Sequence, residues 1–243
     1  MTGKVTEEWY SDNVGQPVRL VRWGHFGTPV LLFPTAGGDA EEVERFLMID
    51  ALAPLIDAGQ IKVYSVDSIA GRAWISGEHP AAYCAALQNG FDAYVYHEIV
   101  PAIRQDCRSD TIEVVTAGAS IGAFNAVASL CRHPDVFRLA IAMSGTFDLS
   151  RFLNGRASMD FYFSSPLHYL PDLEGDALTA LQQRMVLLPS GEGDHEDIGE
   201  SWRLAEVLGR KGVPNRVDSW GPRYHHDWMT WREMLPAYLG EHT

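Results

Sequence analysis

The sequence predicts an α/β fold with a mostly parallel central sheet and helices on both faces. Short apolar stretches alternate with amphipathic stretches of helical length along most of the 243 residues, which is typical of βαβ units. A second observation is the pentapeptide Gly-Ala-Ser-Ile-Gly at residues 118–122, where a predicted strand turns directly into a helix. No linker rich in Gly, Ser or Pro divides the chain, so we expect a single domain over residues 1–243.

Each element follows from its hydrophobic periodicity. An alternating stretch predicts an early antiparallel strand at residues 18–23. Apolar or mostly apolar runs predict the other strands, which we place at residues 29–34, 61–66, 112–117, 139–144, 185–188 and 216–220. Helical spacing predicts helices at residues 41–58, about 81–105, 123–133, 198–211 and 228–239.

The pattern breaks down between residues 147 and 181. This segment contains Asn154-Gly155, Ser164-Ser165-Pro166 and Leu170-Pro171, with aromatic residues between them. Long irregular segments in a compact fold are usually functional. We therefore expect a short cap-like segment beside a pocket, and a plain surface excursion is the alternative.

The composition of the chain limits the classes of partner that it could bind. The formal net charge is −13 and the chain has no basic run, which disfavours nucleic acid and anionic membranes. The N-terminal residues lack the pattern of a signal peptide, and no apolar run is long enough to span a bilayer, so we expect a cytoplasmic protein. The three cysteines form neither a disulfide framework nor a metal-ligand spacing, and a homo-oligomer is left open.

The pentapeptide at residues 118–122 has the pattern of a nucleophile elbow. A strand that becomes a helix within five residues must bend sharply, and small flanking residues such as Gly118 and Gly122 keep side-chain atoms out of the bend. Ser120 would then be lifted above the sheet at the start of a helix. With 22 glycines in the chain a chance match is the alternative, but the strand–turn–helix context favours a nucleophile.

A serine nucleophile needs a base and an acid that orients the base. Such groups sit at the carboxyl ends of strands in open α/β sheets. After the strand at 185–188 the chain offers Asp194 and Glu196, and after the strand at 216–220 it offers His225 and His226. The order serine, acid, histidine is that of α/β-hydrolases.

The C-terminal residues carry a more specific resemblance. The motifs that carry it are Pro34–Asp39, Ser164–Pro171, Gly191-Glu192-Gly193, Trp220-Gly221, His226-Asp227-Trp228, Trp231-Arg232 and Leu235-Pro236. With these motifs the sequence resembles the Putative esterase family of α/β-hydrolases, related to esterase D (S-formylglutathione hydrolase) and to the mycolyltransferases, and in particular a bacterial subgroup with a C-terminal His-Asp-Trp motif. The likeness covers nearly the whole chain.

The resemblance implies an α/β-hydrolase fold and names His226 as the catalytic base. His225 occupies a position that relatives often fill with glycine, so the neighbouring histidine is the alternative. For the acid, the Gly-x-Gly-x-x-Glu pattern of the family points to Glu196. The general α/β-hydrolase pattern, with an acid soon after the strand, points to Asp194.

The oxyanion hole requires two backbone N–H groups. We expect one from Ile121, directly after the nucleophile, and one from the loop after the strand at 29–34. Pro34 has no N–H, so position favours Ala36, with Thr35 as the alternative. Candidate substrate-binding residues are the aromatic side chains Trp74, Tyr162, Phe163 and Trp228, for each of which core packing is the alternative.

The function that these features predict is a serine esterase. It would cleave a carboxylic ester of a small molecule through an acyl-enzyme intermediate, without a cofactor or a metal. An acyltransferase with the same triad and a non-catalytic binding protein on the same scaffold are the alternatives. We expect a preference for short acyl chains, because no long apolar lid helix is apparent in the sequence.

Overall fold

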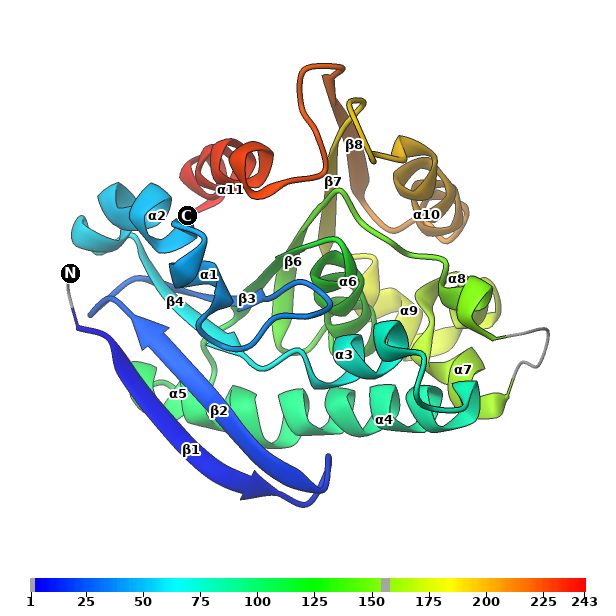
Figure 1. Ribbon diagram of the computed structural model, residues 1–243, viewed down its shortest axis with the longest axis horizontal. Helices are drawn as coiled ribbons and strands as arrows, with labels where there is room; N and C mark the ends of the chain where they lie inside the picture. Colours follow the sequence, from blue (N-terminus) through cyan, green and yellow to red (C-terminus); the bar gives the residue numbers. More distant parts are fainter. Residues whose placement is uncertain (1–2, 154–157) are drawn as a thin grey trace.

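A mixed β-sheet runs through the middle of the computed structural model (Figure 1), which describes residues 3–153 and 158–243. Within these residues eight strands form one sheet in the order β1-β2-β4-β3-β5-β6-β7-β8. Strand β2 pairs antiparallel with β1 and β4, and every pairing from β4 to β8 is parallel. The strands are β1 (Val5–Ser11), β2 (Gln16–Trp23), β3 (Thr28–Phe33), β4 (Ile61–Val66), β5 (Val114–Ala119), β6 (Phe137–Met143), β7 (Met185–Gly191) and β8 (Asn215–Gly221).

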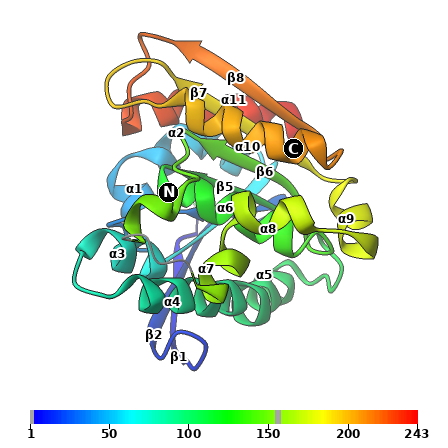
Figure 2. The ribbon, with the colours of Figure 1, turned by 90° about the vertical axis from the view of Figure 1, so that its right-hand side faces the viewer.

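Helices cover both faces of this sheet. One face packs against α2 (Met48–Asp57) and α11 (Trp228–His242), and the other against α4 (Ala81–Tyr94), α5 (Val100–Cys107), α6 (Ile121–Arg132) and α10 (Ile198–Arg210). Figures 1 and 2 show α10 and α11 on opposite sides of β7 and β8. Strands β3, β4 and β5 are almost entirely buried because both faces are covered, which explains their continuous apolar sequences. The predicted α/β fold is confirmed.

The predicted helix at residues 41–58 is broken. It consists of α1 (Glu42–Arg45) and α2, separated by Phe46 and by Leu47, whose φ of 62° lies in the left-handed region. This conformation is unfavourable for a residue with a Cβ atom. The break leaves the Phe46 and Leu47 side chains about half exposed beside the start of α11.

Outside the segment at 147–181, two elements were not expected from the sequence. Strand β1 is the edge of the sheet, and its mostly exposed, acidic residues hide the period of two that would identify it. Helix α3 (Ile69–Ser76) is short, and Gly71 interrupts its apolar residues. The long predicted helix at 81–105 is present as α4 and α5, joined by a π-helical turn at Val95–Ile99.

The segment at 147–181 is more ordered than its sequence suggests. It folds into short helices, η2 (Leu149–Phe152), α7 (Met159–Ser164), α8 (Pro166–Tyr169), η3 (Leu170–Asp172) and α9 (Gly175–Leu181). Each is too short for its periodicity to be recognised. Asn154 and Gly155, which also belong to the predicted cap, lie outside the described residues. Across the described part of the chain, no helix has the length and apolar character needed to cross a bilayer.

Candidate active site

Ser120 sits at the tight bend between β5 and α6. Its backbone has a φ of 57° and a ψ of −121°, a strained conformation for a residue with a side chain. A Cβ atom at Gly118 would lie 2.3 Å from the carbonyl of Gly122, and one at Gly122 would lie 2.6 Å from the carbonyl oxygens of Phe33 and Pro34. Both glycines are therefore required by backbone packing around the serine.

His226 lies in the loop between β8 and α11 and faces the acid loop that follows β7. Its Nδ1 atom is 3.4 Å from Oε2 of Glu196, and its backbone N–H donates to the carbonyl of Asp194 at 3.0 Å. The Glu196 side chain is 1% exposed, whereas that of His226 is 25% exposed. The imidazole thus connects a buried carboxylate with the solvent-accessible pocket.

Two serines that the sequence analysis did not single out hold the buried carboxylate. Ser144 donates to Oε1 of Glu196 at 2.5 Å, and Ser190 donates to Oε2 at 3.3 Å. The Ser144 hydroxyl also accepts a hydrogen bond from the indole N–H of Trp231 at 3.0 Å. Ser144 directly follows β6 and has a φ of 45°. A polar residue just after a buried strand is the signal that could have identified it.

The neighbouring pair of candidates, Asp194 and His225, has a different arrangement. The Asp194 side chain is 86% exposed, and its backbone N–H donates to Nδ1 of His225 at 2.8 Å. A Cβ atom at Gly193 would lie 2.6 Å from that Nδ1 atom, so the glycine makes room for the ring. The geometry therefore places Glu196, and not Asp194, next to the ring of His226.

The loop after β3 places the backbone N–H groups of Ala36 and Gly37 at the pocket, and neither has a hydrogen-bond partner among the residues described. The N–H of Thr35 donates to Oε2 of the buried Glu42 at 2.7 Å, so it is not available to a substrate. Ile121 is the first residue of α6, and a helix leaves the N–H groups of its first turn without partners inside the helix.

Ser120, His226 and the loop after β3 line one pocket of about 390 Å³. It is lined by Thr35, Ala36, Gly37, Ser120, His226, Asp227, Trp228 and Trp231. Asp227 caps the N-terminus of α11 by accepting a hydrogen bond from the N–H of Thr230 at 2.9 Å. Trp228 stacks on Phe46 with ring centroids 5.1 Å apart and an interplanar angle of 5°.

Three of the four expected substrate-binding aromatics do not line this pocket. Trp74 is 3% exposed and packs in the core, with its indole N–H donating to Gln88 at 3.3 Å. Tyr162 and Phe163 line a separate pocket of about 350 Å³ beside Cys131. The segment that carries Tyr162 and Phe163 packs against α4 and α6. None of the three side chains lines the pocket of Ser120, and their role in substrate binding stays a prediction.

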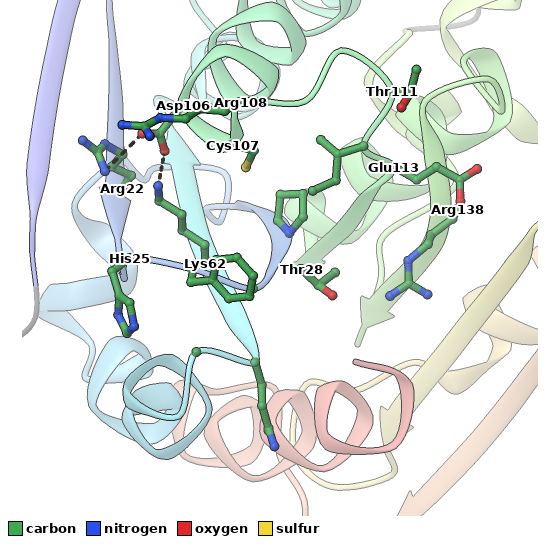
Figure 3. Close-up of a pocket in the computed structure, with 16 residues that line it drawn as sticks. Arg22, His25, Thr28, Lys62, Asp106, Cys107, Arg108, Thr111, Glu113 and Arg138 are labelled. Atoms are coloured by element: carbon green, nitrogen blue, oxygen red, sulfur yellow. Dashed lines mark ion pairs between the residues drawn. The ribbon is translucent and has the colours of Figure 1, made fainter.

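A cavity of about 1250 Å³ lies at the opposite end of the strands (Figure 3). Its walls include the first residues of β3 and Lys62 near the start of β4, whereas Ser120 follows the end of β5. Asp106 pairs there with Arg22 at 3.2 Å and with Lys62 at 2.5 Å. None of the candidate catalytic residues lines this cavity. The carboxylate of Asp106 on its wall is engaged in ion pairs with Arg22 and Lys62.

Comparisons with known proteins give a family for the chain and relatives of its fold. Residues 50–242 match the family model described as Putative esterase. Similar solved structures include a ferulic acid esterase, an S-formylglutathione hydrolase from Agrobacterium tumefaciens and Mycobacterium tuberculosis MPT51 (FbpC1), each with a TM-score of 0.73. Their sequences are 18%, 14% and 16% identical; the alignments cover 98%, 98% and 99% of this chain and 96%, 94% and 98% of the respective structures.

At these identities the structural neighbours show the fold alone. They are α/β-hydrolases, as the predicted topology requires. No curated protein sequence matches the chain. The family model covers most of the chain and matches the region that contains Ser120, Glu196 and His226. The chain belongs to the Putative esterase family of α/β-hydrolases and is a carboxylic ester hydrolase.

Proposed function

We propose that the protein hydrolyses carboxylic esters of small molecules through an acyl-enzyme intermediate on Ser120. His226 is the base in this proposal, and Glu196 is the acid that orients it. The observation that carries the proposal is the position of the His226 ring, which contacts the buried Glu196 and lines the same pocket as Ser120. Asp194 is set aside because its carboxylate points to solvent.

The chemistry follows from the tautomer that Glu196 would select. A carboxylate next to Nδ1 favours a proton on that nitrogen and leaves Nε2 free to accept the proton of the Ser120 hydroxyl. The deprotonated oxygen attacks the ester carbonyl, and the imidazolium then protonates the leaving alcohol. Water attacks the resulting acyl-enzyme with the same histidine as base. The N–H groups of Ile121 and Ala36 would stabilise both tetrahedral intermediates.

Trp228 is the substrate-binding side chain that the pocket supports. It is partly exposed and is backed by the half-exposed Phe46, so the pair forms an apolar wall between α1 and α11. We expect this wall to contact the apolar part of the ester. The hydroxyl groups of Ser144 and Ser190 contact Glu196, and none of these three residues lines the pocket.

The decisive experiment combines labelling with kinetics. Purified protein is treated with a fluorophosphonate probe and assayed with p-nitrophenyl esters from acetate to octanoate. We expect labelling of Ser120 that is lost in Ser120→Ala. We expect kcat to fall roughly 10²- to 10⁴-fold in Glu196→Gln and to stay within about threefold in the matched variant Asp194→Asn.

Unlabelled Ser120 in folded protein would refute the proposal and favour a binding protein. Equal losses in Glu196→Gln and Asp194→Asn would refute the choice of acid. Addition of an acceptor alcohol identifies an acyltransferase, because the acyl group would then appear mainly on the alcohol instead of in the free acid.

A further inference from the structure

The loop between β3 and α1 is closed around a buried carboxylate, that of Glu42. Glu42 is the first residue of α1 and is only 6% exposed. Its Oε2 atom accepts the N–H of Thr35 and its Oε1 atom accepts the Thr35 hydroxyl, both at 2.7 Å. A Cβ atom at Gly38 would lie 2.3 Å from Oε2, so the glycine provides the space for the carboxylate.

This carboxylate has no cationic partner among the residues described. Arg45, one turn further along α1, pairs instead with Asp39 at 2.8 Å. A buried charge is costly to desolvate unless its hydrogen bonds are satisfied, and both bonds of Glu42 go to Thr35. A hydrophobic residue would fill the same space at a lower desolvation cost. The carboxylate is therefore better explained by what it does to Thr35 than by fold stability.

The bonds at Thr35 determine where the next N–H points. The carbonyl of Thr35 accepts the N–H of Gly38 at 3.0 Å, while its own N–H is held by Glu42. The described chain has no cis peptide bonds, and in a trans peptide the carbonyl and the following N–H point in opposite directions. The N–H of Ala36 therefore points away from the turn, and Ala36 lines the pocket of Ser120.

We propose that Glu42 is a positioning residue for ester hydrolysis, which orients the Ala36 N–H toward the oxyanion by holding both polar groups of Thr35. This inference rests on the proposed function, because it requires that the substrate oxyanion forms beside Ser120. Glu42 itself touches no reacting atom. Its role is to keep the loop in the geometry that the transition state needs.

The test compares three substitutions of one side chain. In Glu42→Gln the amide oxygen can accept the Thr35 N–H and the amide NH₂ can donate to the Thr35 hydroxyl, so we expect kcat within about threefold of wild type. Glu42→Asp cannot reach both groups and Glu42→Ala reaches neither. Loss of one oxyanion donor costs about 10²- to 10³-fold in kcat, so we expect a misdirected donor to lower kcat by about 10- to 100-fold, with KM changed less than about threefold.

A second readout separates positioning from simple stability. A trifluoromethyl ketone that forms a tetrahedral adduct with Ser120 should bind Glu42→Asp and Glu42→Ala more weakly by the same factor as the loss in kcat/KM. Glu41→Ala is the matched control, because Glu41 is adjacent, more exposed and paired with Lys4 and Arg19. It should leave both measurements unchanged.

Three results would overturn the inference: folded Glu42→Asp or Glu42→Ala with wild-type kcat, a fall in kcat without weaker binding of the ketone, or an equal loss in Glu42→Gln. If Glu42→Ala does not fold, the comparison of kcat between Glu42→Asp and Glu42→Gln tests the inference. Failure of the proposed function is recognised separately, because wild-type protein would then show no Ser120-dependent activity.

Discussion

Ser144→Ala is the substitution whose consequences follow most directly from the site. The serine is 3% exposed, donates to Glu196 and accepts from the indole N–H of Trp231. Alanine keeps the backbone strain at φ 45° unchanged, since it has the same Cβ atom. The substitution therefore removes two hydrogen bonds and little else.

The magnitude can be worked from those two bonds. A hydrogen bond to a charged group contributes about 1.5–3 kcal/mol, and a buried donor left without a partner costs about 1–3 kcal/mol. The free energy of unfolding should therefore fall by about 2.5 to 6 kcal/mol. For a chain of this size each kcal/mol lowers Tm by about 2–4 °C, so Tm should fall by at least about 5 °C.

Activity should fall as well, because Glu196 keeps only Ser190 and His226 as partners. If about 1.4 kcal/mol of the lost bond is expressed in the transition state, kcat falls about tenfold. The assays are urea unfolding followed by fluorescence, and steady-state hydrolysis of p-nitrophenyl acetate below the unfolding transition.

Ser201→Ala is the matched control. Ser201 is a fully buried serine on α10 whose hydroxyl has no hydrogen-bond partner among the described residues. Its replacement should leave stability unchanged or slightly raised, and activity unchanged. If Ser144→Ala behaves like Ser201→Ala in both assays, the assignment of Ser144 as the support of Glu196 is incorrect.

Two further predictions concern the pocket wall and the opposite end of the sheet. Phe46→Ala removes the ring stacked on Trp228; since such a pair contributes about 0.5–1.5 kcal/mol, KM for a naphthyl ester should rise roughly two- to tenfold with kcat unchanged, and an equal rise in KM for p-nitrophenyl acetate would contradict the assignment. Burial favours a higher pKa for Asp106, but hydrogen bonds from Lys62 and Tyr64 outweigh it and hold the pKa below the ordinary value of 3.8. Its contribution to stability is therefore present above that value and is lost as the pH falls through the lowered pKa. Asp106→Asn leaves the buried Lys62 without its carboxylate partner, so its free energy of unfolding should be about 3 kcal/mol lower than wild type at pH 7. That difference should shrink at acidic pH in urea titrations, and a constant difference would be inconsistent with the ion pair.

Much of the fold could be predicted because its signals are local. Strands such as β3 and β4 are continuous apolar runs, and their burial on both faces produces that composition. The break between α1 and α2 could not be predicted, because the apolar spacing of residues 41–58 continues through it. The left-handed φ of Leu47 and the stacking of Phe46 on Trp228 are visible only in the tertiary structure. The expectation of a single domain stays a prediction.

The candidate substrate-binding aromatics also show what a sequence pattern does not determine. Trp74, Tyr162 and Phe163 are aromatic and near the right part of the sequence, yet they face the core or another pocket. Composition indicates that a segment has apolar side chains to bury, but it does not indicate which surface will bury them. That choice depends on how α7 and α8 pack against α4 and α6.

The sequence by itself determined the elbow, the order of strands and helices, and the short set of candidates for base and acid. These depend on a few adjacent residues: the glycines around Ser120 satisfy steric demands within one turn. For the acid, the family resemblance pointed to Glu196 and the general α/β-hydrolase pattern to Asp194; the tertiary structure places Glu196 beside the ring of His226. Only the tertiary structure showed that Ser144 supports Glu196 and that Glu42 holds the Thr35 loop. Ser144 and Glu196 are 52 positions apart in the chain. Contacts between segments so distant arise from packing of the whole sheet, and a local pattern does not encode them.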